Sequence, residues 1–200
     1  SEAPAAMRGP PRTELTSEGL DTFAEVFLNG EKVLDADNAF RTWRIPVQGR
    51  LREGSNEVRV VLRSPIGRLL PQVQAVPHRI AGNYPSPYGD EPKDVLTANF
   101  VRKPGYHYGW DWGPRYVTAG IWRDVQLTSW DIARVQDLQI RQDRVTADVA
   151  EVTAIPTVDI ATPGDYAIRT WQIAPGGRRT VVATRRIALP AGINRIPQAV

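Results

Sequence analysis

The 200-residue sequence contains no cysteine, only two histidines (His78 and His107) and only three lysines among its 25 basic residues. Without cysteine, the chain can form no disulfide and no zinc–thiolate site, and it has no thiol nucleophile. Two histidines are too few for a histidine-rich metal site. The sequence therefore predicts no metal and no cofactor. The redox compartment stays open, and a periplasmic or secreted location is compatible with this composition.

Long apolar runs and concentrated charge of one sign are also missing. No run approaches the roughly twenty apolar residues that a membrane-spanning helix needs. The 25 basic residues are interspersed with 22 acidic ones, which leaves a formal charge of only +3. Nucleic-acid binding normally requires a concentrated basic surface. The sequence therefore predicts neither a membrane nor a nucleic acid as partner.

Familiar catalytic patterns are absent as well. The chain has no glycine-rich phosphate loop of either common spacing, no cluster of metal ligands and no convincing Ser-His-Asp arrangement. We therefore assign no catalytic residue within these 200 positions.

What is present is a series of short segments that alternate apolar and polar residues. Asn29-Gly30 lies between β-prone flanks and predicts a tight hairpin, because both central residues of a type I′ turn need positive φ. Segments 41–47 and 57–63 alternate as half-buried strands do, and segment 120–128 predicts a further strand. The pattern predicts an all-β fold.

Residues 64–106 have a different composition, with seven prolines and little periodicity. This composition predicts a long packed loop that carries a helical turn around residues 67–74. Long ordered loops on a β scaffold are frequently binding elements.

Three parts are predicted along the chain. Residues 1–18 lack a clear pattern and are expected to be a loose N-terminal segment, and residues 19–130 form a first β-sandwich. Residues 131–200 contain short strands separated by turn signals, which predicts a second sandwich. Because segment 192–200 begins another strand, we expect this second sandwich to be incomplete.

The most unusual stretch is YHYGWDWGPR, residues 106–115. Three of the six tryptophans and three of the six tyrosines lie between 106 and 122. Pyranose rings lie well on indoles, and a carboxylate such as Asp111 can accept two hydrogen bonds from sugar hydroxyls. Alternatively, Trp110 and Trp112 are core wedges and Asp111 satisfies nearby backbone amides. Both interpretations remain open on residue chemistry alone.

Three neighbours of this stretch are weaker candidates. Asn99 has an amide suited to a sugar hydroxyl or to a turn. Arg102 and Lys103 have side chains suited to an anion or a hydroxyl, although such pairs are mostly solvated. For His107 we favour a structural hydrogen-bonding role over that of a base.

Several motifs together resemble the glycoside hydrolase family that contains β-mannosidases, β-galactosidases and β-glucuronidases. GLDTFAEVFLNG (19–30), ADNAFRTWRIPV (36–47), NFVRK (99–103) and TAGIWRDVQL (118–127) resemble its N-terminal sugar-binding region, and GWDWGP points to the β-mannosidases. The resemblance implies a galactose-binding-like jelly roll, here incomplete, at 19–130. It implies an incomplete immunoglobulin-like sandwich at 131–200.

The resemblance also implies a function. The β-mannosidases of this family hydrolyse terminal β-D-mannose with retention, using two glutamates from a downstream (β/α)₈ barrel, which is too large for this chain. Trp110 and Asp111, and less strongly Trp112, Asn99 and Arg102, would then contact the β-mannoside, and the isolated chain would be inactive. The alternatives are a non-catalytic carbohydrate-binding module and a structural or protein-interaction sandwich.

Overall fold

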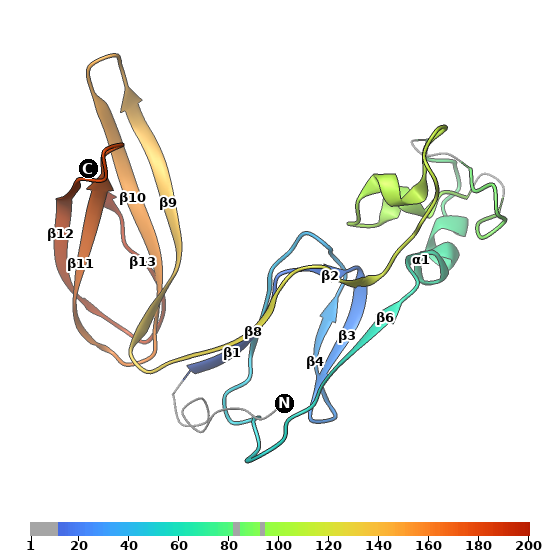
Figure 1. Ribbon diagram of the computed structural model, residues 1–200, viewed down its shortest axis with the longest axis horizontal. Coiled ribbons are helices and arrows are strands. Elements are labelled where there is room, and N and C mark those ends of the chain that lie inside the picture. Colours follow the sequence, from blue (N-terminus) through green and yellow to red (C-terminus); the bar gives the residue numbers. More distant parts are fainter. Residues whose placement is uncertain (1–11, 82–84, 93–94) are drawn as a thin grey trace. The chain divides into compact units, whose positions relative to one another are not determined.

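The computed structural model describes residues 12–81, 85–92 and 95–200, and these are mostly strands (Figure 1). The chain forms two compact units, Thr13–Ser129 and Trp130–Val200. Each unit has its own buried apolar cluster. The prediction of an all-β fold is confirmed. In the described part of the chain, no helix is long and apolar enough to cross a membrane.

The first unit is a sandwich of two three-stranded sheets. One sheet has the order β5-β1-β8 and the other has the order β4-β3-β6, while β2 and β7 form a separate short pair. Their bounds are β1 (Arg12–Ser17), β2 (Leu20–Asp21), β3 (Phe23–Leu28), β4 (Glu31–Ala36), β5 (Trp43–Pro46), β6 (Val58–Arg63), β7 (Gly120–Ile121) and β8 (Val125–Trp130).

The core of this unit lies between the two larger sheets. Leu15 of β1 and Ile45 of β5 come from one sheet, and Val26 of β3 comes from the other. Side chains along β3 alternate between buried and partly exposed, because every second side chain of a strand points to the same face. One face of β3 is therefore in the core. The predicted strands within 41–47 and 57–63 are confirmed as β5 and β6.

The predicted hairpin at Asn29-Gly30 is also confirmed. Both residues have positive φ, 53° and 87°, and they join the antiparallel strands β3 and β4. The Asn29 amide donates to the Asn56 Oδ1 atom at 2.9 Å, and its Oδ1 accepts from the Glu57 backbone N–H at 3.1 Å. The turn is therefore tied to the segment that leads into β6.

Two predictions about local structure were wrong. Residues 12–17, which we had assigned to a loose segment, form β1 and pair with β5. The single strand expected at 120–128 is interrupted between β7 and β8. The interruption occurs at Trp122, whose indole N–H donates to the Ala39 carbonyl at 3.0 Å. The ring lies so close to Gly19 that a Cβ there would be 2.5 Å from Nε1, so this position requires glycine.

The proline-rich segment contains one α-helix, α1 (Pro65–Gln74), and two 3₁₀ turns, η2 (Thr97–Phe100) and η3 (Gly105–Tyr108). Helix α1 covers the predicted helical turn. It begins where the Ser64 hydroxyl accepts the Gly67 backbone N–H at 3.3 Å, with Pro65 in the first turn, where proline costs no hydrogen bond. The second of these turns, η3, contains the first three residues of the stretch 106–115.

The second unit is a smaller sandwich. Strand β10 pairs with β9, β13 and β14 in one sheet, and β11 pairs with β12 in the other. Apolar residues of β10 and β12 contribute to its core, with Val158, Ile160 and Leu189 buried. The bounds are β9 (Ala133–Val145), β10 (Ala150–Ile160), β11 (Gly164–Ile173), β12 (Arg179–Leu189), β13 (Gly192–Arg195) and β14 (Gln198–Ala199).

Candidate functional site

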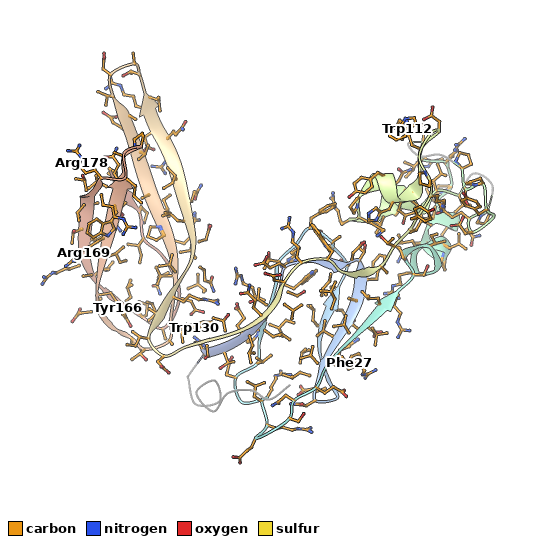
Figure 2. The ribbon with its side chains drawn as sticks, in the orientation of Figure 1. Phe27, Trp112, Trp130, Tyr166, Arg169 and Arg178 are labelled. Atoms are coloured by element: carbon orange, nitrogen blue, oxygen red, sulfur yellow. The ribbon has the colours of Figure 1, made fainter. Side chains whose placement is uncertain are left out.

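An exposed turn carries the two indoles and the carboxylate that the sequence singles out. The Trp110 backbone N–H donates to the Gly113 carbonyl at 3.1 Å, and the Gly113 N–H donates back to the Trp110 carbonyl at 3.3 Å. Trp110 is 57% exposed and Trp112 is 85% exposed. Figure 2 shows Trp112 at the outer end of its segment. The alternative that these indoles are core wedges is therefore wrong.

Asp111 lies between the two indoles at the end of this turn. One carboxylate oxygen, Oδ1, accepts the Trp112 backbone N–H at 3.0 Å, which fixes the orientation of the side chain. The other oxygen contacts no donor in the described part of the chain, and the residue is exposed. Part of the carboxylate thus stabilises the turn, as the second interpretation expected, and part faces outward.

The two glycines that flank the turn have different roles. Gly109 has a φ of 87°, and a Cβ at this position would lie 3.1 Å from the Cβ of Arg115. Both the backbone conformation and the close approach therefore require glycine here. At Gly113 a Cβ would meet Trp110 at an ordinary distance of 3.5 Å, so the space there is less restrictive.

The base of the turn is held by Arg115, whose side chain is only 3% exposed. Its guanidinium donates to Asp90 Oδ2 at 3.0 and 3.1 Å and to Glu91 Oε2 at 2.7 Å. It also donates to the Tyr108 carbonyl at 3.2 Å. The Arg115 side chain therefore connects Tyr108, which precedes the turn, with Asp90 and Glu91.

The carboxylates around Arg115 are themselves well supported. The Glu91 side chain is fully buried and also accepts hydrogen bonds from the backbone N–H and the hydroxyl of Thr97. Burial opposes ionisation of Asp90, but hydrogen bonds from Ser86 and Arg115 hold its pKa below the ordinary value. Burial raises the pKa of Tyr108, which lies under the guanidinium, to about 12. The arrangement places two carboxyl groups around one buried arginine.

A second buried ion pair is formed by Lys103 and Asp21. The Lys103 ammonium is completely buried, contacts Asp21 and donates to the Thr118 carbonyl at 2.6 Å. The expectation that Lys103 is solvated was therefore wrong. This pair connects β2 to the chain on both sides of residues 106–115.

His107 lies beside this pair, with Nδ1 3.7 Å from Asp21 Oδ2 and 3.4 Å from the Thr118 hydroxyl. Burial and the Lys103 charge lower the pKa of His107, and the Asp21 carboxylate only partly opposes them. The neutral imidazole is therefore the favoured form, in keeping with a structural role.

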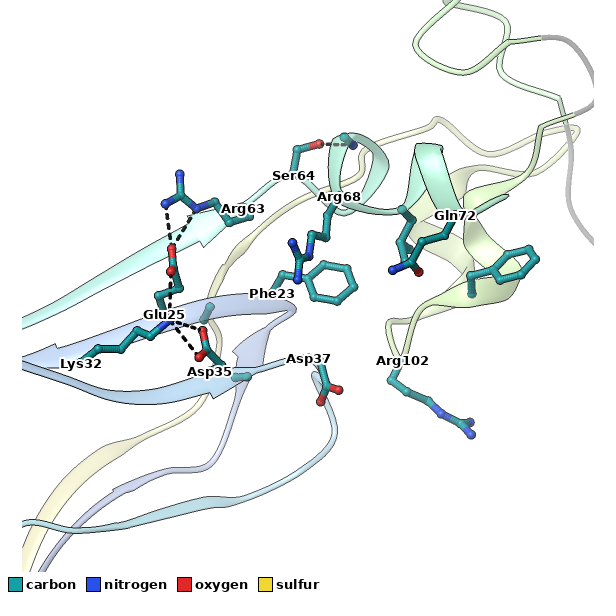
Figure 3. Close-up of a pocket in the computed structure, with 15 residues that line it drawn as sticks. Phe23, Glu25, Lys32, Asp35, Asp37, Arg63, Ser64, Arg68, Gln72 and Arg102 are labelled. Atoms are coloured by element: carbon teal, nitrogen blue, oxygen red, sulfur yellow. Dashed lines mark hydrogen bonds and ion pairs between the residues drawn. The ribbon is translucent and has the colours of Figure 1, made fainter. Parts of the chain in front are cut away.

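The structure does not gather all the candidate residues around Asp111. The Asn99 amide donates to the Ile80 carbonyl at 3.0 Å, and so it supports the loop. The backbone of Arg102 forms a bridge with Asn38, and its carbonyl accepts the Ala39 N–H at 2.9 Å. Arg102 is one of the residues that line a groove beside α1, and its side chain extends away from Arg68 and Gln72 (Figure 3). Only Trp110, Asp111 and Trp112 share the exposed turn.

Sequence reasoning missed the buried partners of the turn. Arg115 is about two dozen positions away from Asp90 and Glu91, and no periodic pattern links them. The available signal was an arginine directly after Gly-Pro and a pair of acids within a proline-rich loop. Such a loop needs internal charge pairs because it lacks the backbone ladder of a sheet.

Comparison with known protein families assigns the chain to one of them. Residues 1–123 match the family model described as glycosyl hydrolase 2 galactose-binding domain-like. This match covers more than half of the sequence, and the chain therefore belongs to that family. The resemblance inferred from the sequence motifs is confirmed.

The relatives are β-mannosidases. The chain is 37% identical over 136 residues to β-mannosidase B of Thermothelomyces thermophilus and 38% identical over 149 residues to β-mannosidase B of Neosartorya fischeri. The matches cover 68% and 72% of this chain but only 15% and 17% of those proteins. The chain thus spans a small part of the length of its curated relatives.

Solved structures agree with this placement. A β-D-mannosidase from Dictyoglomus thermophilum matches all of this chain and 23% of its own length, with a TM-score of 0.79 and 29% identity. A β-glucuronidase of glycoside hydrolase family 2 has a TM-score of 0.65 at 14% identity, which shows a shared fold.

Replacing Arg115 by methionine should destabilise the first unit. The change leaves the Glu91 carboxylate buried without its cation, and breaking such a pair costs about 3–5 kcal/mol. The matched control is Arg50→Met, because Arg50 pairs with Glu31 at 2.6 Å on the surface and should cost under about 1 kcal/mol. Urea unfolding measures both. Similar small losses for the two variants would contradict the structural role of Arg115.

The pKa of His107, followed by NMR, should lie below the ordinary histidine value of about 6.5. Because the folded chain disfavours the protonated ring, its stability should be complete above that pH and decline as the pH falls through the folded pKa. His107→Gln should remove this part of the pH dependence. A midpoint at or above the ordinary value would contradict the assignment.

Proposed function

We propose that this chain is part of a retaining β-mannosidase that hydrolyses terminal non-reducing β-D-mannose residues. Its turn at Trp110, Asp111 and Trp112 forms one wall of the mannose subsite. The two catalytic glutamates come from a (β/α)₈ barrel that is not among these 200 residues. The supporting facts are the family membership, the β-mannosidase relatives and the exposed turn.

The observation that carries the proposal is the outward-facing carboxylate of Asp111 between two exposed indoles. Large exposed apolar side chains are a cost unless they meet a ligand or another surface. A sugar ring offers an apolar C–H face to an indole and hydroxyls to a carboxylate, and bonds to a charged acceptor are about twice as strong as neutral ones. The turn has the groups that this ligand needs.

Arg115 has the role of a positioning residue in this proposal. It does not face outward, but it fixes the two ends of the turn through Tyr108 and the buried acids. Binding groups are effective when the surrounding contacts hold their geometry. A rigid base keeps Asp111 oriented before the substrate arrives.

Acids of this chain other than Asp111 are poor candidates for the reaction. Glu91 is fully buried and is used by Arg115 and Thr97. Retaining hydrolysis needs two carboxyls on opposite sides of the scissile bond, about 5 Å apart. The proposal therefore assigns substrate contact, and not catalysis, to these residues.

Asp111→Asn in the full-length protein that contains the barrel tests the proposal. The amide oxygen still accepts the Trp112 N–H, so the turn should keep its shape while the charged acceptor is lost. We expect kcat/KM for an aryl β-mannoside to fall at least about tenfold, which corresponds to about 1.4 kcal/mol of transition-state stabilisation.

The control is Asp148→Asn, an exposed aspartate in the β9–β10 turn, which should leave kcat/KM unchanged. If Asp111→Asn behaves like this control, the subsite role is wrong. Calorimetric binding of mannose to the isolated chain, with no effect of Asp111→Asn on full-length turnover, would instead support the alternative of a non-catalytic carbohydrate-binding module.

A further inference from the structure

A groove of about 1120 Å³ lies within the first unit, between the sheet β4-β3-β6 and the elements α1 and η2 (Figure 3). None of Trp110, Asp111 and Trp112 lines it. The groove is therefore separate from the exposed turn, and the proposed function makes no use of it. Side chains from β3, β4, α1 and η2 face it, so segments distant in sequence converge there.

One wall of the groove is a fixed network of charges. Glu25 Oε2 accepts from Arg63 at 2.7 and 3.0 Å, and Lys32 lies 3.4 Å from Glu25 and 2.9 Å from Asp35. These four groups neutralise one another. Arg63, first among the causes, lowers the pKa of Glu25 by hydrogen bonding, against a smaller desolvation effect. The wall is thus polar and ordered without carrying a net charge.

Four further polar side chains of the lining have no partner in the described part of the chain. Asp37, Arg68, Gln72 and Arg102 form no side-chain hydrogen bond or ion pair there. Figure 3 shows Arg68 and Gln72 extending from α1 on the side where Phe23 also lies. They provide two guanidinium donors, one carboxylate acceptor and one amide that serves as both.

Two aromatic rings complete the lining, Phe23 at the start of β3 and Phe100 at the end of η2. Both are half-buried, so each packs against the protein and keeps part of its surface exposed. Aromatic faces of this kind suit an apolar ligand surface, such as the C–H face of a pyranose ring.

The combination of these groups restricts the class of ligand. A polyanion would meet the carboxylates of Asp37, Glu25 and Asp35, and an apolar molecule would leave four polar groups unsatisfied. A neutral polyhydroxylated ligand can accept from the guanidiniums, donate to the carboxylate and cover an aromatic ring. We propose that this groove binds a neutral oligosaccharide, at a site distinct from the turn at Trp110, Asp111 and Trp112.

This inference gives Arg102 a different role from the one that the sequence suggested. Arg102 was a candidate for contact with the same sugar as Asp111, but it is one of the residues that line the groove. Its backbone is held by Asn38 and Ala39, so its position at the groove does not depend on a ligand. The inference does not depend on the proposed function, because it concerns binding and not turnover.

The test is an NMR titration of the full chain with mannopentaose and with cellopentaose. Asp111→Asn is included in every sample so that the exposed turn contributes less. We expect saturable shifts for the amides of residues 23, 37, 68, 72 and 100 with at least one pentasaccharide, with a dissociation constant of about 1 mM or tighter. Arg68→Ala should weaken binding about tenfold.

Gln72→Ala and Gln74→Ala form a matched pair, since both glutamines are exposed on α1 but only Gln72 lines this groove. Alanine favours the helix at both positions, so folding is preserved. Gln72→Ala should weaken binding at least about threefold, and Gln74→Ala should not change it. The inference is overturned if neither sugar gives a shift at about 10 mM, if shifts are confined to residues 109–116, or if both glutamine variants bind like the parent chain.

Discussion

The candidate site depends on one buried interaction, the ion pair between Arg115 and Glu91. The described residues between 64 and 119 form no strand, so this segment cannot rely on a sheet ladder to fix its backbone. One guanidinium instead contacts two acids and a carbonyl, and the fully buried Glu91 also binds Thr97. A buried charge pair of this kind is costly to break from one side, which makes the geometry of the adjoining turn well defined.

Around this pair, the residues that hold the turn differ from the residues that could contact a ligand. The groups that hold the turn are inside: Arg115, Glu91 and Lys103. The groups that could meet a ligand are outside: Trp110, Asp111 and Trp112. The sandwich supplies the rigid base and the proline-rich segment supplies the exposed groups, which is the usual division of labour between a β scaffold and its loops. The groove beside α1 follows the same rule, with a neutralised wall and unpartnered side chains facing the cavity.

Much of the sandwich was predictable because strands and turns are encoded locally. Asn29-Gly30 requires a turn, and the alternation that leads to Ile45 and Val47 requires a strand with one buried face. Strand β1 was missed because its residues are buried on both faces and include Thr13, Glu14 and Thr16, so no apolar alternation marks it. The turn at 109–113 was recognised from its composition. Its buried partners were not, because Asp90, Glu91 and Asp21 reach it only through tertiary contacts.

The most direct measurement of the central claim is a double-mutant cycle between Arg115→Lys and Asp111→Ala on kcat/KM, in the full-length protein with its barrel. If Arg115 acts by orienting Asp111, Arg115→Lys should lower kcat/KM at least about tenfold alone and under about twofold when Asp111 is already alanine. A general loss of folded protein would reduce activity by the same factor in both backgrounds. Equal factors would therefore contradict the account.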